Sequence, residues 1–374
     1  MKVYFDNAAT TSMDSQVIEE MTLTMKEVFG NPSAIHSQGR HARASVEIAR
    51  KNIAKLIHCH SSEIIFTGSG TEADNMALRC AVHDLNVKTI ITSKVEHKAV
   101  LDTAKSLEED GLATIKYVQV DSMGRVDTEN LNKLAEKNPG SLISLMHANN
   151  ELGTLNDVHK ISEIARTHQC YFHSDTVQTV GHYPINLEEW DVDFITCSAH
   201  KFHGPKGVGF LYKNKSLKIK PMVTGGGQES AMRAGTENVT GIVGLSKALE
   251  IANIGIQDKI KKIQSIKDYF IDQLNTHIDG IKYNGDILED GSLYTVLNTS
   301  IPPNKASSTL LFQLDINGIN VSGGSACNSG AVGYSHVIEA INHPKERPVI
   351  RFSFSKYSTK KEVDYVIHKL TELT

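Results

Sequence analysis

The sequence has little of several features that would define its class at once. No apolar run approaches the roughly 18 residues that a membrane-spanning helix needs, so we expect no integral membrane protein. Basic and acidic residues nearly balance, 39 against 43, and the formal net charge of −4 offers no electrostatic surface for nucleic acid or an anionic membrane. The N-terminus reaches Asp6 before a signal-peptide core could form. We therefore expect a cytoplasmic protein with a small-molecule ligand.

Cysteine is scarce and unpaired. The five cysteines are scattered and lack any Cys-x-x-Cys pair, which fits neither a disulfide framework nor a zinc ribbon. The runs His-Cys-His at 58–60 and His-Gln-Cys at 168–170 have poor spacing for zinc, so we expect no metal.

One cysteine differs from the others in its surroundings. Cys327 lies in a Gly- and Ser-rich run at 321–330, which is typical of an exposed loop. The other four fall in segments predicted to be helix or strand, where a free cysteine usually behaves as a small buried hydrophobe. Cys327 is therefore the candidate reactive thiol. Surface placement alone is the alternative, because reactivity also requires a lowered pKa.

The sequence does contain enough apolar residues, 40%, for a substantial core. At about 150 residues per domain, 374 residues suggest two or three domains. Seven β-rich runs alternate with helical stretches such as 97–109 and 157–168, which is typical of βαβ units and a mainly parallel sheet. The seven predicted strands are 63–67, 88–93, 113–120, 141–148, 170–175, 193–198 and 208–212.

The pattern changes after a run of three glycines at 225–227. A long helical stretch is predicted over about 239–274, and strand-like segments at 293–299 and 350–354 follow among helices. This order indicates a smaller α+β domain with its own core.

Polar side chains follow four of the predicted strands. The run Gly-Ser-Gly-Thr-Glu at 68–72 leads into a helix and offers N–H groups and a hydroxyl to a phosphate, although a plain N-cap by Thr71 is the alternative. The runs 147–151, 173–178 and 198–201 follow three further strands, and each residue alone has a structural explanation. Because ligands gather at the carboxyl ends of parallel strands, we expect these residues to share a pocket.

Together these side chains supply what a pyridoxal 5'-phosphate site requires. Lys201 can form the Schiff base, Asp175 can keep the ring nitrogen protonated, and Gln178 can reach the phenolic oxygen. A protonated ring nitrogen lets the ring accept the electron pair left when a substrate Cα–H bond breaks. The phosphate would be bound by Gly70, Thr71, Ser198 and His200.

The motifs resemble, in order and over essentially the whole chain, the class V aminotransferase superfamily, and within it the class I cysteine desulfurases of the NifS/IscS type. The matching segments are 5–11, 30–33, 66–75, 93–97, 149–151, 199–201 and 225–238. The resemblance implies an α/β protein of fold-type I, with a large cofactor-binding domain at 13–255 around a mainly parallel seven-stranded sheet. Residues 1–12 and 256–374 would form a smaller α+β domain with a mobile cysteine loop at 321–333.

The resemblance also implies roles for individual residues. Lys201 is the Schiff-base lysine, Asp175 the partner of the ring nitrogen, and His97 the residue that stacks on the ring and acts in proton transfer. Asn150 and Arg351 would bind the substrate carboxylate, a task that suits a planar guanidinium.

The segment 225–238 resembles the family's interface loop, in which Thr236 would reach the phosphate of the partner subunit in a homodimer. Ala231 and Ala234 stand where the family more often has glycine and serine, and Thr176 replaces a smaller residue. A glycine's backbone freedom is lost at 231.

The implied reaction converts L-cysteine to L-alanine and leaves the sulfur on Cys327 as a persulfide. A protein acceptor would then carry the sulfur toward iron–sulfur clusters or thio-cofactors. A selenocysteine lyase remains an alternative, as does a class V aminotransferase or lyase that needs no thiol. A non-catalytic pyridoxal phosphate protein is opposed by the joint presence of Lys201, His97 and Cys327.

Overall fold

The computed structural model describes residues 1–287, 291–304, 307–323 and 335–374, so most of the expected cysteine loop, with Cys327, lies outside the described residues. The helices of the described chain are α1 (Ser15–Glu27), α2 (Ser37–Leu56), η1 (Ser61–Glu63), α3 (Gly70–Asp84), α4 (Lys98–Glu109), α5 (Thr128–Lys137), α6 (Val158–Thr167), α7 (Leu187–Trp190), η2 (Ala199–Lys201), α8 (Gln228–Ala231), α9 (Val239–Asn253), α10 (Ile256–His277), α11 (Leu310–Ile316), α12 (His336–Ala340) and α13 (Lys360–Leu373). The strands are β1 (Val3–Tyr4), β2 (Ile64–Thr67), β3 (Thr89–Ser93), β4 (Thr114–Val118), β5 (Leu142–Ser144), β6 (Tyr171–Asp175), β7 (Phe194–Ser198), β8 (Gly209–Lys213), β9 (Lys282–Asn284), β10 (Val296–Ser300), β11 (Ile319–Asn320) and β12 (Val349–Ser353).

The seven predicted strands form one sheet, in the order β2-β8-β7-β6-β5-β3-β4. Neighbours pair in parallel except at β8, which runs antiparallel to both β2 and β7. The prediction of a mainly parallel seven-stranded sheet is therefore confirmed, with most strand ends displaced by one or a few residues. The carboxyl ends of the parallel strands meet at one edge of this sheet.

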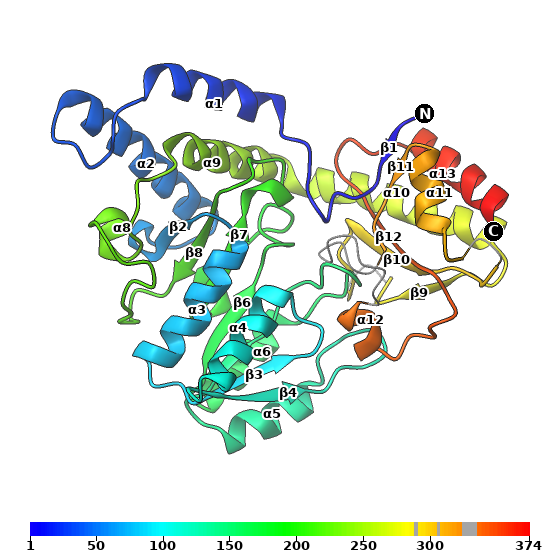
Figure 1. Cartoon of the computed structure of the whole chain (residues 1–374), viewed down its shortest axis with the longest axis horizontal. Coiled ribbons are helices and arrows are strands. Elements are labelled where there is room, and N and C mark those ends of the chain that lie inside the picture. Colours follow the sequence, from blue (N-terminus) through cyan, green and yellow to red (C-terminus); the bar gives the residue numbers. More distant parts are fainter. Residues whose placement is uncertain (288–290, 305–306, 324–334) are drawn as a thin grey trace.

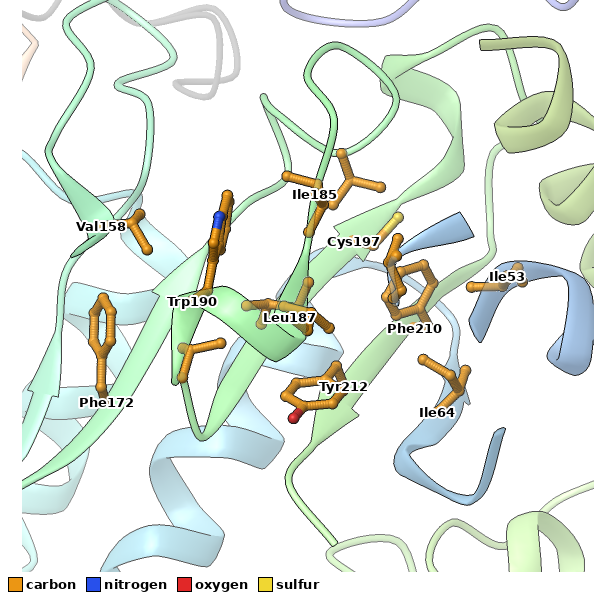
Figure 2. Packing of buried hydrophobic residues seen from close by; sticks show 14 of the residues in the cluster. Ile53, Ile64, Val158, Phe172, Ile185, Leu187, Trp190, Cys197, Phe210 and Tyr212 are labelled. Atoms are coloured by element: carbon orange, nitrogen blue, oxygen red, sulfur yellow. The ribbon is translucent and has the colours of Figure 1, made fainter. Parts of the chain in front are cut away.

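Helices cover both faces of the sheet (Figure 1). Neighbouring residues of a strand point to opposite faces: Phe194 packs with the residues of α3 and α4, whereas Ile195 packs with those of α2, α6 and α9. Figure 2 shows the second of these faces, where Phe172, Trp190 and Phe210 fill the space between sheet and helices. Burial on both faces explains why these strands read as nearly continuous apolar runs.

A second core lies beside the large sheet (Figure 1). The antiparallel sheet β12-β10-β9 packs there against α10 and α13, and the rings of Phe270, Phe352 and Phe354 meet edge to face. Phe5 joins the same cluster, and β1 pairs in parallel with β11. The N-terminal strand thus packs with the C-terminal part of the chain.

Three local predictions need correction. The long helical stretch is two helices, α9 and α10, which meet at 76° because Gly255 adopts the left-handed conformation at φ +60°. Cys59 lies in a bend after α2, and Cys170 directly precedes β6, so neither sits inside a helix or strand.

Among the described residues, no single helix is long and apolar enough to cross a membrane. The bent pair α9 and α10 reaches the required length and apolar composition only when the two helices are taken together.

Candidate active site

A cavity of about 330 Å³ opens at the carboxyl edge of the large sheet. Its lining combines residues that follow β2, β3, β5, β6 and β7 with the N-terminal Ala8 and Ala9 and with Arg351 of β12. The predicted site residues that the structure places on this lining are Gly70, Thr71, His97, Asn150, Asp175, Gln178, Ser198, His200, Lys201 and Arg351. The topology therefore brings together side chains that lie up to 281 residues apart in the sequence.

Lys201 enters the cavity from η2, directly after β7. Its Nζ donates hydrogen bonds to the carbonyl oxygens of Ala8, at 2.6 Å, and Ala9, at 3.0 Å. Gln178 Nε2 donates to the same Ala8 oxygen at 3.1 Å. The N-terminal segment is itself fixed, because Thr11 N donates to the carbonyl of His200. A primary amine is thus held inside the cavity by neutral acceptors.

Three ionisable side chains of the cavity lining, Asp175, Asp74 and His97, lie close to one another. Asp175 ends β6, Asp74 lies on the buried face of α3, and His97 N-caps α4 through Nδ1. One ligand atom from each lies within 4.8 Å of the others. Burial raises the pKa of Asp175, and the neighbouring Asp74 raises it further.

Asp74 shows what this cluster requires. Asp74 is 1% exposed, and its Oδ1 has no hydrogen-bond partner among the residues that the structure describes, although His173 Nε2 lies 3.4 Å away. Two buried carboxyl groups of this kind are stabilised by a proton or a cationic group placed between them and the cavity. The arrangement therefore favours a ligand that carries a positive charge at this end.

The N-terminus of α3, on the same lining, suits a negatively charged group. Ser69, and not Thr71, is the N-cap, because Ser69 Oγ accepts from Glu72 N at 3.2 Å. Gly70 and Thr71 then form the first turn, where helical N–H groups lack intrahelical partners and suit an anion. A Cβ at position 70 would come within 2.7 Å of Val177 Cγ2, so glycine allows this turn to pack closely against the segment after β6.

His200 adds a neutral polar group on the same lining. Its Nδ1 lies 3.1 Å from Thr10 Oγ1, and burial lowers the pKa of His200 to about 4, with the charge of Lys201 acting in the same direction. The imidazole is therefore neutral near pH 7 and acts through its hydrogen-bonding nitrogens.

Arg351 is the buried cation on the second core's side of the cavity. It is 3% exposed on β12, where Nη2 pairs with Asp6 Oδ1 and Nη1 donates to the carbonyl of Asn150, both at 2.9 Å. Its Nε has no hydrogen-bond partner in the described structure. The interpretation of Arg351 as a surface residue at a strand end is therefore excluded. A buried guanidinium with a spare donor is suited to a carboxylate.

Thr236 is the predicted site residue that the structure describes and that the cavity lining does not include. Cys327 lies outside the described residues. Thr236 is exposed between α8 and α9.

The segment before Thr236 is strained. Glu229, Ser230 and Ala231 adopt left-handed conformations at φ +48°, +55° and +63°. Glu229 holds them in place, because its carboxylate binds the Arg50 guanidinium at 2.7 and 2.8 Å and accepts from Phe66 N at 2.8 Å. Position 231 therefore has a backbone conformation that favours glycine, although the residue there is alanine.

Sequence reasoning missed Asp74, Glu151 and the N-terminal carbonyls of Ala8 and Ala9. Asp74 had a signal, since it is a charged residue within the apolar face of α3. Glu151 belonged to a quoted motif, but nothing in the sequence shows that its carboxyl group turns into the cavity. The carbonyl acceptors had no signal, because backbone groups carry no sequence information.

The chain matches known proteins over nearly its whole length. The aminotransferase class-V family model matches residues 3–366. A cysteine desulfurase IscS of Dictyoglomus turgidum is 46% identical, covering 100% of this chain and 94% of that protein. A putative cysteine desulfurase IscS 1 of Bacillus subtilis is 42% identical, covering 97% and 96%.

Solved structures show the same relationship. A NifS-like protein superposes with a TM-score of 0.91 at 39% identity, covering 100% of this chain and 99% of that chain. A structure of SspA in complex with cysteine superposes with a TM-score of 0.84 at 30% identity, covering 96% and 100%. The chain therefore belongs to the aminotransferase class-V family and has its fold-type I architecture. Within that family it groups with the cysteine desulfurases of the NifS and IscS type.

Proposed function

We propose that this chain is a pyridoxal phosphate-dependent cysteine desulfurase, which converts L-cysteine to L-alanine and transfers the sulfur to Cys327. The observation that supports this most strongly is the placement of Lys201, Asp175 and Arg351 on one cavity lining. An amine, a buried carboxyl group and a guanidinium are the three functions needed to bind the cofactor, hold its ring nitrogen and bind an amino-acid substrate.

The residues of the cavity fit pyridoxal phosphate at both ends. The buried Asp74 and Asp175 carboxyl groups would be stabilised by a protonated ring nitrogen. The first turn of α3, which a Cβ at position 70 would fill, suits the phosphate together with Ser198 and His200. Lys201 would bind the aldehyde carbon, His97 would lie over the ring, and Gln178 would reach the phenolic oxygen.

We assign the steps of the reaction to this chain's own residues. Arg351 and Asn150 bind and orient the substrate carboxylate, and Lys201 Nζ takes the proton from the substrate Cα. When bound, the cofactor supplies an electron sink that weakens the bonds at the substrate's Cα and Cβ. The Cys327 thiolate attacks the substrate sulfur, so that an S–S bond forms and the Cβ–S bond breaks. The electron pair left on the carbon side takes up a proton, which yields L-alanine and a persulfide on Cys327.

The other cysteines are poor candidates for this step. Burial raises the pKa of Cys59 and of Cys80 to about 12 and raises that of Cys197 well above its ordinary value. Cys170 is buried. Because only a thiolate is strongly nucleophilic, elimination among the described cysteines leaves Cys327.

The active form is proposed to be a homodimer. Large apolar side chains on and after α1 and on α2 are exposed, which is typical of an interaction surface. These residues are Leu23, Met25, Phe29, Ile35 and Ile48, with exposed fractions of 52, 59, 76, 90 and 60%. Thr236 would then reach the phosphate bound by the second subunit.

The persulfide is proposed to pass to a protein acceptor in the cytoplasm, such as an iron–sulfur cluster scaffold or a sulfur carrier. We retain the division into a cofactor-binding domain at 13–255 and a smaller domain from 1–12 and 256–374, supported by the separate core around Phe270. No observation favours selenocysteine over cysteine as the substrate, so cysteine is proposed because related proteins carry that name.

The proposal is tested by following alanine and sulfide from L-cysteine with a thiol reductant. Cys327→Ser should bind the cofactor and L-cysteine and form at most trace sulfide, whereas the matched control Cys59→Ser should retain turnover. Full turnover by Cys327→Ser would refute the persulfide role, and amino-group transfer without sulfide would identify an aminotransferase instead.

A further inference from the structure

Glu151 is a buried carboxyl group on the lining of the active-site cavity that the proposed reaction leaves without a role. It is 7% exposed, and its backbone is fixed on both sides: Glu151 N donates to Asn149 Oδ1 at 2.9 Å, and its carbonyl accepts from Asn298 Nδ2 at 3.0 Å. The side chain is fixed as well, because Ser335 Oγ donates to Glu151 Oε2 at 2.6 Å. The carboxyl group is thus held rigidly at the cavity.

Glu151 lies beside the residues that are proposed to bind the substrate carboxylate. Its chain neighbour Asn150 offers the carbonyl that Arg351 Nη1 binds. Among the ion pairs of the described residues, Arg351 is paired with Asp6, while the hydrogen-bond partner of Glu151 is the neutral Ser335. In the part of the chain that the structure describes, Glu151 forms no ion pair, although the charges of Arg351, His97 and Lys98 act on it from a distance; its carboxyl group faces whatever occupies the cavity.

Resting on the proposed function, we propose that Glu151 determines side-chain specificity: its carboxylate excludes amino acids whose side chain is anionic and admits those whose side chain is neutral. Arg351 already binds Asp6 and would take the substrate's α-carboxylate. A second negative charge on the substrate would lie near the Glu151 carboxylate without a spare guanidinium to compensate it. Specificity of this kind works by repulsion of the wrong ligand.

Charge on Glu151 also gives the exclusion a pH dependence. Burial raises the pKa of Glu151 to about 7, against the lowering influence of the Ser335 hydroxyl on α12, Arg351 on β12, and His97 and Lys98 at the start of α4. The carboxyl group is ionised above that pH and neutral below it. The exclusion is therefore strong at about pH 8 and weak at about pH 6, while an aspartate side chain with a pKa near 4 stays ionised at both.

The test compares L-aspartate with L-asparagine, two ligands of nearly equal shape that differ in charge. Their dissociation constants are measured by titration calorimetry on the cofactor-loaded dimer at about pH 8. The ratio of the aspartate constant to the asparagine constant should fall by up to about tenfold in Glu151→Gln, which keeps the shape and removes the charge. The surface control Glu163→Gln removes an exposed carboxylate that pairs with Lys160 and should keep the ratio.

The second measurement varies the pH. In the unmodified chain the ratio of the aspartate to the asparagine dissociation constant should fall as the pH is lowered from about 8 to about 6. In Glu151→Gln the same ratio should stay constant. An unchanged ratio in Glu151→Gln, or a flat ratio in the unmodified chain, would overturn the inference. Turnover of L-cysteine is measured on the same samples: turnover with an unchanged ratio refutes the role of Glu151 alone, and a shifted ratio without turnover refutes the desulfurase alone.

Discussion

Replacing Arg351 by lysine tests how the proposed substrate site binds a carboxylate. The change keeps one positive charge on β12 but replaces a planar fork of donors by a single ammonium group. In the structure the guanidinium already donates to Asp6 and to the carbonyl of Asn150, and its Nε has no hydrogen-bond partner within the described ranges of the chain. A lysine at this position cannot hold Asp6, Asn150 and a substrate carboxylate at the same time.

The expected magnitude follows from the hydrogen bonds lost. One charge-assisted hydrogen bond contributes about 1.5–3 kcal/mol, which corresponds to about 10- to 150-fold in affinity. We therefore expect Arg351→Lys to raise the KM for L-cysteine within that range. Because the guanidinium is not required for the chemical step itself, kcat should fall less than KM rises.

The assay is alanine formation over a range of L-cysteine concentrations, with thermal unfolding measured on the same samples. Arg347→Lys is the matched control, because Arg347 binds the carbonyls of Gly280 and Ser300 and is not on the cavity lining. A KM for Arg351→Lys within twofold of the unmodified chain, with a normal unfolding temperature, would show that Arg351 does not bind the substrate.

Three further changes test the local structure. Ala231→Gly should stabilise the chain by about 1 kcal/mol in urea unfolding. The change removes the cost of a left-handed alanine, about 1–2 kcal/mol, and adds the larger entropy that glycine loses on folding, about 0.5–1 kcal/mol. Destabilisation would refute the strain. Gly70→Ala should lose about 1–3 kcal/mol of stability and release the cofactor more readily on dialysis, because the new Cβ meets Val177; equal retention would contradict the role of this turn. Burial raises the folded-state pKa of Glu96 to about 8, above its ordinary 4.5, so its contribution to stability is complete below about pH 4.5 and declines as pH rises toward 8. Glu96→Gln should therefore gain stability relative to the unmodified chain over that range, and a constant difference would show that Glu96 is ionised in the folded protein.

The large sheet could be predicted from the sequence because its signal is local. Most of the seven strands are short runs rich in apolar residues and are buried on both faces, whereas the edge strand β4 is largely exposed. The helical pattern from 239 to 274 was misread as continuous, since a glycine inside an apolar helix is ambiguous and only its φ of +60° at Gly255 marks the break. The strands β1, β9 and β11 are two or three residues long, and β1 and β11 form by pairing with each other across more than 300 residues of sequence.

Part of the candidate site could likewise be predicted from local sequence, and part of it could not. Lys201, Asp175 and Asn150 follow strands, so the rule for parallel sheets places them at one edge before any coordinates are known. Asp6 and Ala8 could not be predicted as neighbours of Arg351 and Lys201, because those contacts depend on how the N-terminal segment packs with the second core. The roles of these residues, and that of Cys327, stay predictions that the experiments above are designed to test.

The covalent attachment of the cofactor to Lys201 is the central claim and can be measured directly. The purified protein, reduced with borohydride and digested, should yield one peptide whose mass is increased by the reduced cofactor at Lys201, and Lys201→Ala should yield none. A labelled peptide that contains another lysine, or a colourless protein that yields no adduct after incubation with pyridoxal phosphate, would contradict the account.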